Sequence, residues 1–278
     1  MKIHRIAILL ACLLALTACA PKETSKESPK NEPEMLGYSD FSAAYKKSNT
    51  LSDLHYDLSV SYDITLKDDG AEPFSASVDM SGNILITGTD GNNAAFLSGS
   101  KLKFPLYDDA FDLTSYYADG ILYADHYSAI DKTRSKLSEE HLYGAALASL
   151  TCFYEFMNFP ESAISEAGEP SSDIFSCTLA SEKVIGYLYS FTATPLYDTI
   201  GTALTKWEFS DISLGNTISA EGYLTAQAWT VTATGLISDS SGKYTDTTVV
   251  IQAEMKLIEP GNPVKIMPPE LSDYTPVS

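Results

Sequence analysis

The sequence predicts an α+β protein in which one large antiparallel sheet packs against two or three helices. Several long segments alternate between apolar and polar residues, which is the period of a strand with one buried face. Short turns that contain Gly or Asp join these segments, as in antiparallel hairpins. Three other segments carry apolar residues at helical spacing. Because a sheet that is apolar on one face needs a second layer, the helices are expected to cover it.

The N-terminus carries two basic residues and then an apolar run from Ile6 to Leu16. A run of this length is too short to span a bilayer, which takes about 20 residues. It ends in Leu16-Thr17-Ala18-Cys19, which resembles the lipobox of bacterial lipoproteins. The resemblance implies a lipoprotein signal peptide at 1–18 and a lipidated Cys19 that anchors the protein to a bacterial membrane, outside the cytoplasm. An ordinary secreted protein cut after Ala18 and an N-terminal membrane helix are the alternatives.

The segment that follows the signal peptide is expected to be a tether. Residues 19–35 combine the lipidated cysteine with a stretch rich in Pro, Lys, Glu and Ser that has almost no large apolar residues. Such a stretch cannot bury enough apolar surface to fold, so it is expected to be disordered. A single folded domain is expected at 36–270, followed by a C-terminal tail at 271–278.

The charge of the mature chain argues against a polyanionic partner. Removal of residues 1–18 takes away two of the 18 Lys and Arg residues and none of the 37 Asp and Glu residues. The mature chain then has 16 basic and 37 acidic residues, a formal charge of −21. A surface with this charge repels nucleic acid at long range, so no nucleic-acid partner is expected.

The first elements predicted in the folded domain are a helix and a long strand. Residues 38–51 are predicted to form the helix, with Phe41, Ala44 and Tyr45 on one face. Residues 54–66 alternate strictly, and their apolar members are Leu54, Tyr56, Leu58, Val60, Tyr62, Ile64 and Leu66. The alternation predicts a strand whose even-numbered residues are buried and whose odd-numbered residues are exposed.

Turn signals divide the next part of the chain into further strands. A turn at 68–70 precedes strands predicted at 74–80 and 84–87, which Ser81-Gly82-Asn83 is expected to separate. Asp119-Gly120 lies between two strand-like segments and predicts a two-residue hairpin turn. Later strands are predicted at 173–180, 183–193, 207–214, 218–237 and 245–258.

Two further helices are predicted between these strands. Residues 138–157 begin with Ser138 as a cap and are apolar around most of the helix circumference. A helix with this pattern is buried on most sides, so it is expected to lie against the sheet. Residues 195–206 begin with Pro195, and proline is favoured at the first helical position.

Three segments of the chain together resemble one group of lipoproteins. They are LSDLHYDLSVSYDITL at 51–66, YYADGILYADHY at 116–127 and VVIQAEMKLIEPGNPVKIMPPEL at 249–271. In this order they resemble the LolA-like superfamily, including its LppX/LprG-type group, over residues 37–270. The resemblance implies a curved, unclosed antiparallel sheet, a half-barrel, with two or three helices packed on its concave side and an apolar cavity for acyl chains. The resemblance assigns a functional role to one residue, Cys19.

The sequence predicts no catalytic residue, metal site or cofactor. His55, His126 and His141 of the mature chain are far apart in sequence, and nucleophile-elbow, Walker and dinucleotide-binding motifs are absent. The other two cysteines of the mature chain are Cys152 and Cys177. An exported pair of cysteines can form a disulfide, and two buried thiols are the alternative.

These observations predict a membrane-anchored, non-enzymatic lipoprotein that binds or carries a lipid or another hydrophobic ligand. An acyl chain needs apolar surface and no specific polar partner, so a sequence without motifs is compatible with this function. The candidates for the cavity wall are Leu150, Phe153 and Met157, on the most apolar helix. The alternative is a surface module with a filled core that binds protein or glycan.

Overall fold

The computed structural model describes residues 35–67, 72–88, 94–103, 110–127, 132–138, 156–189, 204–238 and 244–276. Residues 35–278 form one compact unit that is distinct from residues 1–34. Because all described strand pairs and the hydrophobic core lie within residues 35–278, this unit can be studied without the N-terminal segment. The predicted signal peptide, Cys19 and all but the last residue of the tether lie outside the described residues. Among the helices that the structure describes, none has the length and apolar character to cross a membrane.

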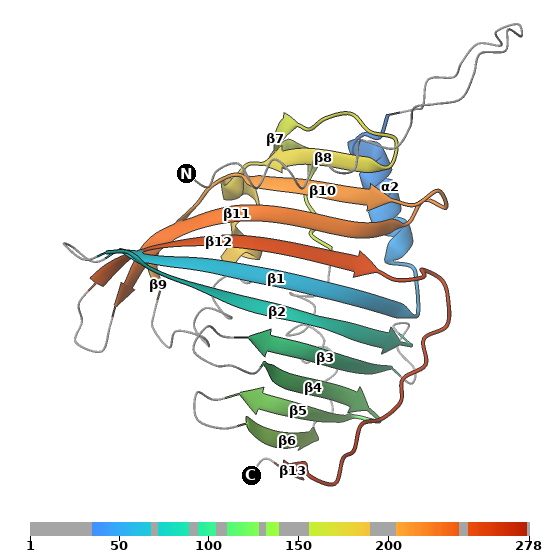
Figure 1. Cartoon of the computed structure of the whole chain (residues 1–278). Coiled ribbons are helices and arrows are strands. Elements are labelled where there is room, and N and C mark those ends of the chain that lie inside the picture. The colour runs from blue at the N-terminus through green and yellow to red at the C-terminus, as the bar shows by residue number, and fades with distance from the viewer. Residues whose placement is uncertain are drawn as a thin grey trace, which may run out of the picture. The chain divides into compact units, whose positions relative to one another are not determined.

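In the described part of the chain, thirteen strands form a single sheet, whose order is β13-β6-β5-β4-β3-β2-β1-β12-β11-β10-β8-β7, with β9 also paired to β11 (Figure 1). Neighbouring strands are antiparallel except for the pair of β6 and β13. Since β7 and β13 lie at opposite ends of this order, the sheet is open. The strands are β1 Leu54–Lys67, β2 Phe74–Thr87, β3 Ala95–Lys103, β4 Phe111–Ala118, β5 Ile121–Tyr127, β6 Lys132–Ser138, β7 Ile164–Ala167, β8 Ile174–Leu179, β9 Leu204–Phe209, β10 Ile212–Ile218, β11 Leu224–Ser238, β12 Tyr244–Leu257 and β13 Thr275–Pro276.

The long alternating strand is confirmed and lies in the middle of the sheet as β1. It pairs with β2 on one side and with β12 on the other. Its even-numbered residues from Tyr56 to Ile64 are all buried, whereas Asp57, Ser59 and Asp63 are exposed. The strand therefore separates a buried side of the sheet, called the inner face here, from a polar side, the outer face.

The predicted interruption between 74–80 and 84–87 is wrong, because β2 runs unbroken through Ser81-Gly82-Asn83. At Gly82 the backbone of β3 comes very close. A Cβ atom on Gly82 would lie 2.5 Å from the carbonyl oxygen of Gly99. The glycine therefore permits close strand packing and does not mark a turn.

The hairpin turn predicted at Asp119-Gly120 is confirmed between β4 and β5. Asp119 has φ 53° and Gly120 has φ 77°, both in the left-handed region. Two consecutive left-handed residues are the signature of a type I′ turn, whose twist matches that of the flanking strands.

The first predicted helix is confirmed as α2, Tyr38–Ser48. The carboxylate of Asp40 accepts a hydrogen bond of 2.8 Å from the backbone N–H of Gly37, which caps the first turn. Phe41 and Ala44 are buried, and α2 contacts β10 and β11. The helix ends three residues earlier than predicted, because Thr50 turns back and donates its hydroxyl to the carbonyl of Lys47.

Three predicted elements differ from the structure in the residues that it describes. Residues 181–183 form a 3-10 helix and 185–189 a short helical turn where a strand was predicted at 183–193. The burial pattern explains the helical turn. Val184 and Leu188, four residues apart, are buried, whereas Ile185 and Tyr189 are exposed. The helix predicted at 195–206 is wrong at its end, where Leu204 begins β9.

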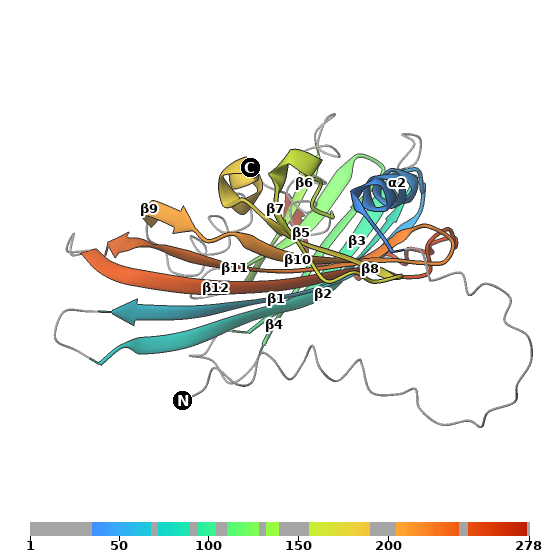
Figure 2. The same cartoon turned by 90° about the horizontal axis from the view of Figure 1, so that it is seen from above.

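The third difference concerns the helix predicted at 138–157. Ser138 is the last residue of β6 and not a helix cap, and Phe156 and Met157 are not helical. Residues 139–155 lie outside the described residues. The fold prediction is therefore correct for the large, open antiparallel sheet and for the first helix, and it is wrong at the described ends of the helices predicted at 138–157 and 195–206. Seen from above, α2 and the helical turn at 185–189 lie on the same side of the sheet (Figure 2).

Part of the segment 271–278, where a tail was expected, joins the sheet. Thr275 and Pro276, the last described residues, form β13 and pair with β6 in parallel. Tyr274 is buried, and its hydroxyl donates to the carboxylate of Asp125 on β5 at 3.2 Å. The same carboxylate accepts the backbone N–H of Thr114 at 2.9 Å. The C-terminal segment thereby covers an otherwise exposed strand edge.

Candidate functional site

The inner face of the sheet carries a continuous row of apolar side chains across six strands. The pairing registers align residues from β2, β1, β12, β11, β10 and β8, which are in turn Met80, Val60, Ala253, Trp229, Leu214 and Cys177. All but Met80 are buried. The apolar surface continues across β2 and β3, where Ile84, Ile86 and Phe96 are also buried. These side chains belong to the hydrophobic core cluster or pack against it.

The adjacent row contains two polar residues, Asn216 and Gln227, which are fully buried. Gln227 Nε2 donates to Asn216 Oδ1 at 2.8 Å and to the carbonyl of Met157 at 3.1 Å, and Gln227 Oε1 accepts the N–H of Met157. Asn216 Nδ2 donates to the carbonyl of Phe175 at 3.1 Å. Because each amide finds partners, this polar pair fits in an apolar surface.

The two hydrogen bonds between Gln227 and the backbone of Met157 hold residues 156–159 on the inner face. Met157 has no exposed surface, and Phe156 meets Tyr56 of β1 edge to face at 5.6 Å. Phe159 stacks on Phe41 of α2 at 4.5 Å, and its carbonyl accepts the hydroxyl of Tyr38 at 2.9 Å. The segment is therefore packed between the sheet and α2. Of the three predicted cavity residues, the structure places Met157 here, whereas Leu150 and Phe153 lie outside the described residues.

Five aromatic side chains gather where β9 and the turn at 185–189 meet β11, and are called the aromatic group here: Tyr187, Tyr189, Trp207, Phe209 and Trp229. Ring centroids lie 5.4 Å apart for Tyr189 and Phe209, 6.1 Å for Tyr187 and Trp229, and 6.4 Å for Trp207 and Phe209. Sequence reasoning missed this group because it assigned 185–189 to a strand and placed the start of β9, from Leu204, in a helix at 195–206. The alternation of Trp207 and Phe209 around a charged residue was the available signal for β9.

Cys177 is a free thiol within the apolar row of the inner face. Burial raises the pKa of its thiol to about 11, so it is neutral at physiological pH. A neutral, buried thiol behaves as a small apolar side chain and is a poor nucleophile. Its predicted partner, Cys152, lies outside the described residues.

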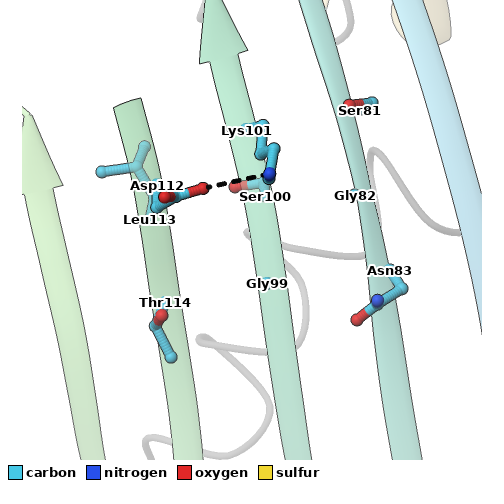
Figure 3. A pocket seen from close by; sticks show the side chains of 9 residues that line it. All are labelled: Ser81, Gly82, Asn83, Gly99, Ser100, Lys101, Asp112, Leu113 and Thr114. Atoms are coloured by element: carbon cyan, nitrogen blue, oxygen red, sulfur yellow. Dashed lines mark ion pairs between the residues drawn. The ribbon is translucent and has the colours of Figure 1, made fainter. Parts of the chain in front are cut away.

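The outer face has a shallow polar depression of about 450 Å³ over β2, β3 and β4. Ser81, Asn83, Lys101, Asp112 and Thr114 surround Gly99, which has no side chain to fill the centre (Figure 3). Lys101 and Asp112 form an ion pair at 3.9 Å, and both side chains are more than two-thirds exposed. Charges this exposed are well hydrated and contribute little binding energy by themselves. The described residues also contain no group of three His, Cys, Asp or Glu that could hold a metal ion.

No protein-family model and no curated protein matches the sequence. Solved structures do match. LprF from Mycobacterium bovis is 12% identical over 83% of this chain and 95% of its own, with a TM-score of 0.32. A LolA superfamily protein from Nitrosomonas europaea is 11% identical over 80% and 93%, with a TM-score of 0.19. A DUF1329 family protein from Desulfovibrio piger is 9% identical over 80% and 93%, also with a TM-score of 0.19. TM-scores below 0.5 do not establish a shared fold, so the function is inferred from this chain's own residues.

Proposed function

We propose that the protein is a non-enzymatic lipoprotein, anchored outside the cytoplasm through Cys19, that binds or carries a lipid or another hydrophobic ligand on the inner face of its sheet. The observation that supports this proposal is the apolar row across six strands, from Met80 to Cys177. The chain itself already buries most of this row, so a ligand on the inner face would take the place of part of the covering segment.

Energetics favour an acyl chain as the ligand. Apolar surface removed from water contributes about 25 cal/mol per Å², and an acyl chain can follow a row of apolar residues without polar partners. The two buried amides of the inner face do not oppose this, because Asn216 and Gln227 bond to each other and to backbone groups. The ligand therefore meets no unpaired amide in the adjacent row.

The finer proposal is that Leu150, Phe153 and Met157 line the ligand site. The chain leaves β6 at Ser138 and returns at Phe156, beside Met157, which is held by β11. In the sheet, β6 and β11 are seven places apart, about 34 Å at the usual strand spacing. The stretch of sequence that contains Leu150 and Phe153 therefore connects two distant strands of the sheet.

Native mass spectrometry of residues 35–278 tests the proposal. The protein is purified from a bacterial host in which it has been in contact with membrane lipids. We expect a bound species with the mass of a lipid, which organic extraction removes, and binding of 11-(dansylamino)undecanoate by the stripped protein. Leu150→Trp should weaken probe binding and leave the melting temperature almost unchanged, whereas Asn83→Ala on the outer face should change neither. A protein without extra mass that does not bind the probe would contradict the proposal.

The outer-face depression favours a second candidate, a surface module that binds glycan or protein. Its asparagine, serine and threonine side chains can hydrogen-bond to hydroxyl groups. If the inner face is filled by the protein itself, Leu150→Trp will overpack it and destabilise the fold by about 1–3 kcal/mol. That result, with no probe binding, would support the module instead of the carrier.

A further inference from the structure

One buried hydrogen-bond donor of the aromatic group has no partner among the described residues. The Nε1–H of Trp207 is shielded from solvent, and no acceptor in the described part of the chain lies within hydrogen-bond distance. An indole N–H can only donate, and buried donors in native proteins nearly always find a partner. The buried amides of the inner face follow this rule, since Gln227 and Asn216 are both bonded. The unmet donor therefore needs an explanation.

The surroundings of Trp207 are suited to one end of an elongated apolar ligand. Trp207 lies where the register between β9 and β11 shifts, between Thr234 and Leu236, and such irregularities re-aim a side chain. Its ring stacks on Phe209, which contacts Tyr189. Tyr189 is 44% exposed and Ile185 39%, so this end of the inner face borders on solvent.

The apolar row and the aromatic group adjoin at one residue. Trp229 belongs to the row, opposite Ala253 of β12, and its ring contacts Tyr187 in the aromatic group. From Trp229 the buried face of β11 continues as Val231 and Ala233, and Ala233 pairs with Phe209, whose ring stacks on Trp207. An acyl chain that follows β11 along this line would therefore place its polar head near the unmet donor.

We propose, on the basis of the function proposed above, that the Nε1–H of Trp207 donates a hydrogen bond to the carbonyl or carboxylate oxygen at the head of an acyl ligand. A free fatty acid and an acyl ester share this acceptor. The net negative charge of the chain favours the neutral ester over the carboxylate at long range. The site therefore selects acyl ligands with an acceptor at the head over alkyl ligands without one.

The tryptophan content of the chain makes this proposal directly observable. The sequence has two tryptophans, so a 15N-labelled sample of residues 35–278 should show two indole N–H signals, assigned by Trp207→Phe. The delipidated protein is titrated with dodecanoate, 1-monododecanoylglycerol and dodecylamine, three ligands with the same chain length. We expect the Trp207 signal to move downfield with dodecanoate, the glycerol ester or both. Protonated dodecylamine has no acceptor and should not produce this shift.

Affinities measured on two variants complete the test. Trp207→Phe keeps an aromatic ring and removes the donor, so it should weaken binding of the acceptor ligands about tenfold and leave dodecylamine affinity unchanged. Tyr189→Phe removes a hydroxyl from an exposed ring of the same group and should change none of the three affinities.

Each outcome decides between the head-group assignment and the function on which it rests. If all three ligands bind but Trp207→Phe weakens none, or weakens all equally, the donor is unmet or bonded to water and the assignment is wrong, while the carrier function stands. If none of the ligands binds to the unsubstituted protein, both are wrong. Should Trp207→Phe fail to fold, the shift of the indole signal in the unsubstituted protein still decides the assignment.

Discussion

Gln227 bonds to both backbone groups of Met157, its amide nitrogen donating to the carbonyl and its amide oxygen accepting the N–H. The side chain thus pairs with a single residue in the way that a neighbouring strand would. It secures the segment 156–159 to the inner face, although this segment is not itself a strand of the sheet. The remaining donor of Gln227 is used by Asn216, so removal of this one side chain leaves several buried groups unpaired.

Gln227→Ala should lower the free energy of unfolding by about 3 kcal/mol, because it leaves the N–H and carbonyl of Met157 buried without partners. The urea midpoint of residues 35–278 measures the effect. Gln252→Ala, at an exposed position on the outer face of β12, is the matched control and should change stability by less than about 0.5 kcal/mol. Equal effects of the two substitutions would show that the Met157 segment is not held by Gln227.

Val60→Asn should destabilise the protein by about 3–5 kcal/mol, because it removes a buried apolar side chain at the centre of the sheet and buries an amide among apolar neighbours. The adjacent Ser61 points to the outer face, where Asp79 and Gln252 are its cross-strand partners. Ser61→Asn should be nearly neutral. Thermal unfolding of both variants is the measurement, and a large loss at Ser61 as well would mean that β1 is buried on both faces.

The stability of the protein should fall at alkaline pH in part because of Cys177. Its pKa is about 11 in the folded protein and about 9 in the unfolded chain. A raised folded-state pKa means that the stabilising contribution is complete below pH 9 and is lost as the pH rises to 11. The loss is on the order of 2 kcal/mol.

Cys177→Ala removes this titration, so its stability should decline less between pH 9 and pH 11 than that of the unsubstituted protein. Tyrosine and lysine titrate in both proteins, and the difference between the two curves isolates the thiol. Parallel curves would count against burial of Cys177. At pH 7.5 the folded protein should also resist alkylation of Cys177 by iodoacetamide until it is unfolded.

Cys19→Ala should release the protein from bacterial membranes or block its maturation, because a stable anchor needs at least two acyl chains on the cysteine. Membrane fractionation and the mass of the mature N-terminus measure this. Cys177→Ala serves as the control and should stay in the membrane fraction. Full membrane retention of the Cys19 variant with its signal peptide removed would show that the lipobox interpretation is wrong.

Much of the sheet was predictable because local patterns decided it. Strict alternation from Leu54 to Leu66 identified β1 and its buried face, and the pair Asp119-Gly120 identified the type I′ hairpin. Of the candidate site, sequence reasoning supplied Met157 and the apolar character of its surroundings. It did not supply Gln227 or Trp207. Gln227 bonds to Met157, 70 residues away, and the ring that Trp207 stacks on, Phe209, contacts Tyr189, which precedes it by about 20 residues. These segments meet only in the folded protein.

The sequence by itself determined the strand-rich, antiparallel character of the protein, the position of α2 and the acidic composition, because each depends on composition or on neighbours within a few residues. Tertiary structure decided the remaining features. Burial of Val184 and Leu188 made 185–189 helical although its residues alternate like a strand, and pairing with β11 made Leu204–Phe209 a strand. The approach of β3 kept β2 continuous through Gly82. In each case the local preference was weak, and contact with distant residues contributed more free energy than the few tenths of a kcal/mol by which local propensities differ.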